Sequence, residues 1–473
     1  MILRLALRSL LTHPIRTLVL ACGFGLGVGV MAMLLGVGEV ILDQARSPAV
    51  SGGGDVVIAS STGDLPSSRW ILSSALRTGG FEKRIAAASP SRRATLYLVS
   101  ENEGSEKVGS GFRRTVDTTP IRTTAGIPSL ERAIGDPETS SITAWTDAAS
   151  DAAWSSPDPG AALAALDRFH PIPDVAARAE SWAEWLYFNG QAGDNQFYLT
   201  FMVGAHRAGV RLQLDRAGTR TSYSQAQDVN DADVLSSAPN LTIGSNSVRL
   251  DGMRYHIALD LPAENGKSRI TGDLVVEASP GRALPPLEIR GAGGWVSGYV
   301  VPVMSGGLSG KLMVDGAPIA FGNGAGYHDH NWGFWKDVSW RWGQVHHGDL
   351  SFVYGRVRPP ADAADPERIP GFLAAIGPDG PVGYATNVSI EETNDPVTGR
   401  PRSITVRGRS SSLDVTMELA IEDAIVTSRG GRLFDEALDF LQLRARYRVR
   451  GRAGDRSIDF TASGAAETFR PGR

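Results

Sequence analysis

The sequence contains little cysteine, no excess of positive charge and few long hydrophobic runs. Cys22 is the only cysteine among 473 residues, which excludes a disulfide framework and a cysteine-based zinc site. The 47 basic and 51 acidic residues leave a net charge of −4, so no basic excess is present to neutralise nucleic-acid phosphates. Hydrophobic residues make up 42% and charged residues 21%, which excludes a polytopic membrane protein and a mainly disordered chain.

One uncharged run near the start of the chain is long enough to cross a membrane. Residues 17–38 comprise 22 residues without a formal charge, and a helix of that length extends over about 33 Å. The flanking charges are Arg4, Arg8 and Arg16 before the run and Glu39 and Asp43 after it. Because positive charge favours the cytoplasmic side, we expect a single-pass anchor over residues 1–45 in the inner (cytoplasmic) membrane. The remaining chain would then be periplasmic.

The segments on either side of this run carry a family pattern. Leu5–Leu18 and Ser51–Ile58 resemble the opening of FtsX/MacB-type ABC-transporter permeases. Those permeases have further membrane helices, and the sequence offers no second apolar run of this length. The resemblance therefore implies a protein that works beside an ABC transporter, with transporter subunits and the membrane as its partners.

Residues 46–177 show the weakest pattern in the chain. Patches rich in serine, threonine, glycine and proline separate short apolar runs, which indicates a partly ordered linker. Ala161–Leu166 is the one segment here that predicts a short helix.

From about Trp182 onward, apolar and polar residues alternate with a period of two. In one run the apolar residues are Met253, Tyr255, Ile257, Leu259 and Leu261. The same alternation recurs over residues 270–276, 413–422 and 441–450. Strands that bury one face and expose the other are typical of antiparallel sheets. About 290 residues with many strands and few helices suit two eight-stranded barrels, so we expect a mainly β fold with two consecutive antiparallel β-barrels.

Histidine and tryptophan are concentrated in one short stretch. Four of the eight histidines and four of the ten tryptophans lie between positions 328 and 347. Because residues i and i+2 of a strand share a face, we expect His328, His330 and Trp332 to project together, with Asp329 and Asn331 opposite. A barrel lumen lined by imidazole and indole could bind an apolar ligand and supply a proton. The same residues could instead form a structural corner of the barrel.

The histidines also leave a metal site open as an alternative. His328 and His330 could chelate Zn²⁺ or Fe²⁺, with a third ligand drawn from His346, His347 and Asp349. The spacing determines no third ligand, so we expect neither a metal nor a cofactor. No pair of carboxylates stands out in the sequence.

Two motifs link the second half of the chain to a family. One is Glu184–Gly190, Glu-Trp-Leu-Tyr-Phe-Asn-Gly, and the other is Tyr327–Gly333, Tyr-His-Asp-His-Asn-Trp-Gly. They resemble the carotenoid 1,2-hydratase (hydroxyneurosporene synthase) and AttH-like family, with Leu186 in place of the family's second tryptophan. The resemblance covers roughly residues 178–473 and implies two lipocalin-like (calycin) barrels, over 178–337 and 338–473, that bind a lipophilic small molecule.

The resemblance also implies a set of site residues. The catalytic candidates are His330, Trp332, Asp329 and Tyr354, and the ligand-binding candidates are Tyr327, His328, Trp185, Tyr187 and Trp335. The hydratases add water to a terminal isoprenoid double bond without a cofactor. An acid protonates the alkene, and an aromatic wall stabilises the carbocation. In that scheme His330 or Asp329 donates the proton and Trp332 faces the cation. The family's downstream Tyr-x-Asp is Tyr354-Gly-Arg356 here, with arginine in place of the carboxylate.

Two functions follow from these patterns. The first is a membrane-anchored, extracytoplasmic lipocalin-like protein that binds a lipophilic molecule as an accessory to an ABC-type transporter. The alternative is a cofactor-free hydratase, isomerase or cyclase that acts on an isoprenoid-like lipid. The permease-like N-terminus favours the first function, and the histidine and tryptophan cluster favours the second.

Overall fold

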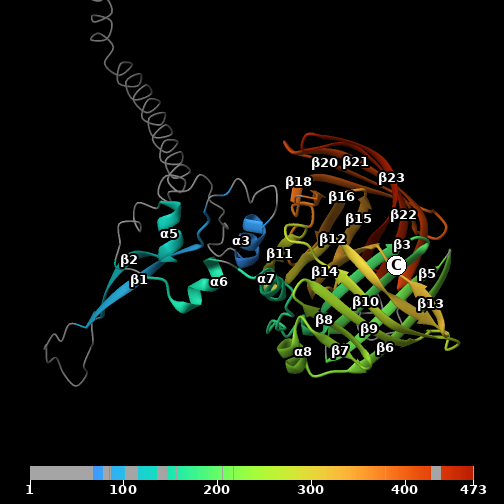
Figure 1. Cartoon of the computed structure of the whole chain (residues 1–473), viewed down its shortest axis with the longest axis horizontal. Coiled ribbons are helices and arrows are strands. Elements are labelled where there is room, and N and C mark those ends of the chain that lie inside the picture. Colours follow the sequence, from blue (N-terminus) through green and yellow to red (C-terminus); the bar gives the residue numbers. More distant parts are fainter. Residues whose placement is uncertain are drawn as a thin grey trace, which may run out of the picture. The chain divides into compact units, whose positions relative to one another are not determined.

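The computed structural model describes residues 68–77, 85, 87–101, 116–135, 144, 146–155, 157–204, 206–216, 218–378, 380–427 and 438–471, and Figure 1 draws the whole chain. The expected anchor over residues 17–38 lies outside these ranges. Within them, no helix has both the length and the apolar character that a membrane crossing requires. The chain divides into two compact units, Met1–Leu65 with Ala87–Ser155 and Pro66–Ala86 with Ser156–Arg473.

The smaller unit contains an antiparallel hairpin and short helices in its described part. Its elements are β1 (Ser91–Glu101), β2 (Val116–Gly126), α5 (Pro128–Ile134), a 3-10 helix (Ala149–Asp151) and α6 (Ala152–Ser155). Helix α5 begins at Pro128, whose fixed φ suits a first helical turn. It ends at Ile134 and is capped by Gly135, which has a φ of 72°, a left-handed conformation that glycine adopts without steric cost. All of these elements fall within the expected linker.

The described helices of the larger unit lie before and between its strands. They are α3 (Ser68–Arg77), α7 (Pro159–Leu166), α8 (Asp231–Ser237) and the 3-10 helices Ala179–Ser181 and Ala292–Gly294. Helix α7 confirms the helix predicted over Ala161–Leu166. The Asp158 carboxylate accepts a hydrogen bond from the Ala161 amide at 2.7 Å, which caps the helix. The C-cap of α7 is Asp167, a residue that becomes important below.

The first sheet has twelve described strands, drawn mainly in green and yellow in Figure 1. Its path is β6-β5-β4-β3-β14-β12-β10-β9-β8-β7, and β11 and β13 also pair with β12. The strands are β3 (Trp182–Ala192), β4 (Asn195–Gly204), β5 (Arg207–Arg216), β6 (Thr219–Asp228), β7 (Leu241–Ile243), β8 (Asn246–Asp251), β9 (Arg254–Pro262), β10 (Arg269–Glu277), β11 (Leu284–Arg290), β12 (Val296–Val314), β13 (Ala317–Ala320) and β14 (Gly324–Phe334). A bridge between Tyr223 of β6 and Ala263, the residue after β9, nearly closes the sheet into a barrel.

The second sheet has nine described strands, in orange and red in Figure 1. Its path is β18-β17-β16-β15-β23-β22-β21-β20-β19. The strands are β15 (Ser339–His347), β16 (Leu350–Arg358), β17 (Phe372–Gly377), β18 (Gly380–Ala385), β19 (Asn387–Asn394), β20 (Pro401–Arg409), β21 (Leu413–Thr427), β22 (Leu438–Ala453) and β23 (Arg456–Pro471). The mainly β fold with two nearly closed, barrel-like antiparallel sheets is thus confirmed.

The period-two alternation explains why these segments are strands. In β9 the buried residues are Tyr255, Ile257, Leu259 and Leu261. In β22 they include Leu441, Leu443, Ala445, Tyr447 and Val449, with the intervening arginines partly or largely exposed. Burying one face of each strand removes a row of apolar side chains from water. Each large side chain buried in this way stabilises the fold by about 1.5–3 kcal/mol. The sequence pattern predicted which of these residues point inward.

Two adjacent strands, β3 and β14, form a wall with two buried faces. They pair antiparallel so that Glu184 lies opposite Trp332 and Tyr187 opposite Asp329. One face, here called the histidine face, carries Glu184, Phe188, His328, His330 and Trp332. The other, here called the carboxyl face, carries Trp185, Tyr187, Tyr327, Asp329 and Asn331.

The second sheet packs against the carboxyl face. The Trp342 indole of β15 donates a hydrogen bond to the Tyr327 hydroxyl at 2.9 Å. Two residues further along β15, the Gln344 side-chain amide donates a hydrogen bond to Asn189 Oδ1, also at 2.9 Å. Both faces of the wall are therefore covered, one by the interior of the first sheet and one by the second sheet.

Candidate functional site

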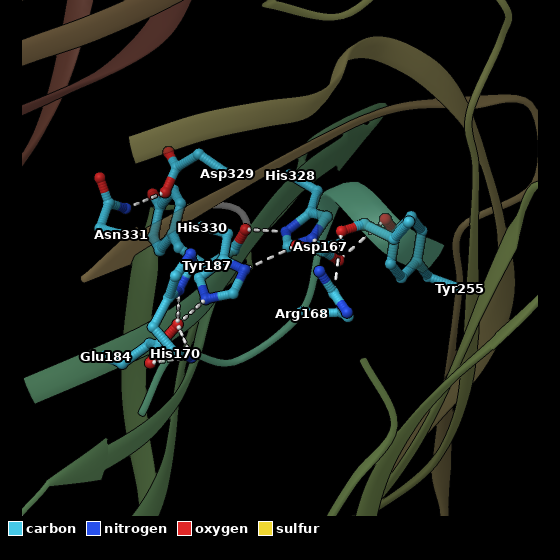
Figure 2. A network of polar contacts seen from close by, with 11 residues as sticks. Asp167, Arg168, His170, Glu184, Tyr187, Tyr255, His328, Asp329, His330 and Asn331 are labelled. Atoms are coloured by element: carbon cyan, nitrogen blue, oxygen red, sulfur yellow. Dashed lines mark hydrogen bonds and ion pairs between the residues drawn. The ribbon is translucent and has the colours of Figure 1, made fainter. Parts of the chain in front are cut away.

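On the histidine face, two histidines of β14 converge on a carboxylate from the end of α7. His328 Nε2 lies 3.0 Å from Asp167 Oδ2, and His330 Nδ1 lies 2.8 Å from Asp167 Oδ1. The Tyr255 hydroxyl of β9 donates to Asp167 Oδ2 at 2.9 Å. Figure 2 shows Asp167 between these three rings. The carboxylate thus accepts three hydrogen bonds in a site fully closed to solvent.

A second carboxylate extends this network towards the surface. His330 Nε2 lies 2.8 Å from Glu184 Oε1, and His170 Nδ1 lies 2.7 Å from the same oxygen. The backbone amide of His170 also donates to Glu184 Oε2 at 2.9 Å. Side chains of the segment after α7, β3 and β14 are therefore joined in one continuous chain of charged hydrogen bonds (Figure 2).

The protonation of His330 follows from its neighbours. Both of its ring nitrogens face carboxylates, which only accept hydrogen bonds, so both nitrogens carry a proton. Burial acts to lower the pKa of His330, but the hydrogen bonds to Asp167 and Glu184 outweigh it and raise the pKa to about 9. Burial likewise acts to raise the pKa of Asp167, yet the charges and hydrogen bonds of His328 and His330 hold that pKa well below its ordinary range. An imidazolium thus lies between two carboxylates.

The space around these rings is filled. Phe188 stacks on His328 with ring centroids 4.1 Å apart, and Phe169 lies 5.3 Å from His330. Both histidines have a relative exposure of 0%, so within the described part of the chain no water-sized space adjoins either ring. The two imidazoles therefore do not line an open lumen, contrary to our expectation from the sequence. The physical reason is that the Asp167 segment and aromatic side chains occupy the interior of the first sheet.

Trp332 lies on the same face and covers His170. The two rings stack at 4.1 Å and 16°. Room for the indole comes from Gly298 of β12, where a Cβ atom would lie only 2.3 Å from the Trp332 ring. The structure therefore brings His328, His330 and Trp332 together.

On the carboxyl face, Asp329 lines a small aromatic chamber between the two sheets. Its wall is formed by Trp185, Gly298, Tyr299, Asp329, Asn331, Trp335, Trp340, Trp342, Val357 and Glu467. The indole of Trp185 lies 4.7 Å from that of Trp335 and 5.6 Å from that of Trp340, centroid to centroid. The chamber has a volume of about 10 Å³, which is room for about one water molecule.

The chamber contains a second buried carboxyl group, Glu467 of β23. Burial raises the pKa of Asp329 to about 6. Burial, followed by the charge of Asp329, raises the pKa of Glu467 well above its ordinary value. Among the described residues, Glu467 Oε1 has no hydrogen-bond partner. Two carboxyl groups in one apolar site cannot both ionise readily, so the pair gives up its last proton at a higher pH than an isolated carboxyl group does.

The other residues of this face surround the carboxyl pair. The Asn331 amide donates to Asp329 Oδ1 at 2.5 Å. The rings of Tyr187 and Tyr327 lie 6.3 Å apart, and burial raises the pKa of each well above its ordinary value. The structure therefore gathers five sequence candidates on this face: Trp185, Tyr187, Tyr327, Asp329 and Trp335.

Tyr354 lies elsewhere, as do the three candidate third ligands of the metal alternative. Tyr354 of β16 is fully buried in the core of the second sheet. His346 bonds to Ser351 at 2.9 Å, and Asp349 pairs with Arg456. His347 stacks on Phe460. None of these three contacts involves His328 or His330.

Sequence reasoning missed four residues that complete the two faces. They are Asp167, His170, Glu184 as a charged group, and Glu467. Glu467 has a local signal, since it is a lone acid in the apolar run Gly464–Phe469. Asp167 has none beyond its position at the end of the predicted helix.

Comparisons with known proteins leave the family open. No family model and no curated protein matches the chain. A crystal structure of a candidate AttH from Nitrosomonas europaea matches at 14% identity and a TM-score of 0.42, over 63% of this chain and 99% of that chain. CghA with Sch210972 matches at 13% identity and a TM-score of 0.39, over 65% and 95% of the two chains. At TM-scores below 0.5, neither similarity establishes a family or a function for this chain. Nearly closed antiparallel sheets do, as a class, include proteins that bind lipophilic molecules.

Proposed function

We propose that the aromatic chamber between the two sheets binds a lipophilic small molecule. The observation that carries this proposal is the composition of its wall, four indoles and a phenol ring around only a few polar groups. Small-molecule sites are typically apolar with a few well-placed polar groups. A volume of about 10 Å³ is far below that of such a ligand, so entry requires the indoles to move aside.

The setting of this function rests on the sequence alone. An uncharged run over residues 17–38 supports a membrane anchor, and the permease-like N-terminus supports a role beside an ABC-type transporter. In this proposal the barrels hold a lipophilic molecule outside the cytoplasm and exchange it with transporter subunits.

Binding can be tested with defined probes. Equilibrium dialysis of the full chain with farnesol, retinol and oleic acid should give close to one bound molecule per chain for at least one probe. Val357→Phe, which fills the chamber, should weaken that binding at least about tenfold, or 1.4 kcal/mol. Trp182→Phe, a change in the core of the first sheet, should leave it unchanged. Equal binding by Val357→Phe and wild type, or binding of none of the probes, would contradict the proposal.

The carboxyl pair favours a second candidate function, cofactor-free acid catalysis on an isoprenoid-like alkene. A proton held by Asp329 or Glu467 would add to one alkene carbon, with the π electrons forming the new C–H bond. The cation left on the neighbouring carbon would face the indoles. Water would then add to that carbon and return a proton to the carboxylate, or loss of a neighbouring proton would give the isomer.

Isotope incorporation distinguishes the two candidates. In D₂O, a catalyst should introduce deuterium into farnesol or convert it to a hydrated or isomerised product, measured by mass spectrometry. Asp329→Asn and Glu467→Gln should each abolish that incorporation while binding persists. If wild type binds the probe and introduces no deuterium, the catalytic candidate fails and the binding function stands.

A further inference from the structure

We propose that His170, Glu184 and His330 form a binding site for a divalent transition metal, with Zn²⁺ as the ion that their donor atoms suit best. One ligand atom from each residue lies within 4.8 Å of the other two. This site is on the histidine face, so it is independent of the aromatic chamber and of the function proposed for it.

The donor set matches known metal chemistry. Two imidazole nitrogens and one carboxylate oxygen are the protein ligands of many catalytic zinc sites and of the non-haem iron facial triad. His170 Nδ1 and His330 Nε2 both lie within 2.8 Å of Glu184 Oε1. Around a tetrahedral zinc ion these atoms would be separated by about 3.3 Å. Admitting the ion therefore requires each nitrogen to move away from Glu184 Oε1 by about 0.5–0.6 Å.

The surrounding groups hold the ligands in position. Asp167 Oδ1 accepts from His330 Nδ1 at 2.8 Å, which leaves Nε2 of that ring directed at Glu184. Carboxylates that bond the remote nitrogen of a histidine ligand are typical of zinc sites. The backbone amide of His170 donates to both Glu184 oxygens, at 3.1 and 2.9 Å. Figure 2 shows Glu184 between the two imidazoles.

The site is accessible from one side. The side chain of His170 has 37% relative exposure, whereas those of Glu184 and His330 have 3% and 0%. An ion could therefore enter past His170, and a water molecule from that side would complete the coordination. The metal would bind the electron pairs of His330 Nε2, His170 Nδ1 and Glu184 Oε1. The proton on His330 Nε2 would be released to bulk water, and the His170 proton would move from Nδ1 to Nε2.

The test uses the full chain after dialysis against a chelator. Titration with ZnSO₄ alone, followed by calorimetry and by metal analysis after desalting, should give one bound ion per chain. CoCl₂ should give the visible absorption of four- or five-coordinate cobalt. His170→Ala removes the ligand nearest to solvent, which should preserve the fold and lower the zinc affinity at least about tenfold.

A matched control separates this site from adventitious binding. His206 lies outside the network, with an exposed side chain paired to Asp231 at 2.9 Å. His206→Ala should bind zinc as wild type does, and so should Val357→Phe in the chamber. Absence of a stoichiometric ion in wild type, or equal zinc affinity in His170→Ala, would overturn the proposal and leave the network a purely hydrogen-bonded one. If Val357→Phe loses farnesol binding and still binds zinc, the chamber and the zinc site are separate sites, and each proposal can fail without the other.

Discussion

The two faces of the β3–β14 wall bury carboxyl groups in opposite ways. On the histidine face, Asp167 accepts hydrogen bonds from two imidazoles and a phenol, and its pKa lies well below the ordinary range. On the carboxyl face, burial raises the pKa of Asp329 to about 6 and that of Glu467 well above its ordinary value. Asp167, Asp329 and Glu467 are all buried, so the two faces exclude water from their carboxyl groups to a similar degree.

The difference comes from the neighbours and not from the depth of burial. A carboxylate with cationic donors within 3 Å stays ionised, whereas one among indoles and another acid retains its proton. His330 and Asp329 are adjacent in the chain, so a single step along β14 separates a charged network from a proton-holding pair. Three substitutions can break or sharpen this comparison.

The largest effect is expected for Asp167→Asn. This change removes the anionic partner of two buried imidazoles, and breaking one side of a buried ion pair costs about 3–5 kcal/mol. The free energy of unfolding from urea titration should fall by that amount. Asp362, which pairs with Arg178 and has 69% side-chain exposure, provides the control, because Asp362→Asn should change stability by less than about 0.5 kcal/mol. A similar small loss in both variants would show that the network contributes little.

An intermediate effect is expected for Gly298→Ala, which links the two faces through β12. The added methyl group would meet the Trp332 ring at 2.3 Å and force it from its stack on His170. Overpacking of this kind costs about 1–3 kcal/mol. Gly307→Ala in the same strand is the matched control, since its nearest neighbour would be 3.9 Å away. Thermal unfolding of both variants measures the difference, and equal losses would remove any special role of Gly298.

The smallest effect at a single pH, and the one that depends on pH, is expected for Glu467→Gln. The folded protein keeps a proton on Glu467 that the unfolded chain releases above its ordinary pKa of 4.5. Stability should therefore be greatest below that pH and decrease as the pH rises, by at most about 1.4 kcal/mol per unit for this group. Glutamine mimics the protonated acid and removes this decrease.

Urea unfolding between pH 5 and 8 tests that expectation. Glu467→Gln should lie close to wild type at the acidic end and exceed its stability by a margin that grows towards pH 8, at no more than about 1.4 kcal/mol per pH unit. Glu418→Gln, at an exposed pair with Arg450, should follow the wild-type profile. A parallel profile for Glu467→Gln would mean that Glu467 is ionised in the folded protein.

The sequence by itself determined the strands and their faces. The alternation in β9, β21 and β22 predicted the buried side chains, because an extended chain directs successive residues to opposite sides. The same rule placed His328 with His330 and Asp329 opposite, and the segment Ala161–Leu166 predicted α7.

Only the tertiary structure decided what each face meets. Asp167 and Glu467 are far from β14 in the chain. Asp167 reaches it from the end of α7, and Glu467 reaches it from β23, a strand of the second sheet. These distant partners decide that the histidine face carries a charged network and that the carboxyl face lines the aromatic chamber. A period-two pattern carries no information about them, since it records which side chains share a face and not what packs against that face.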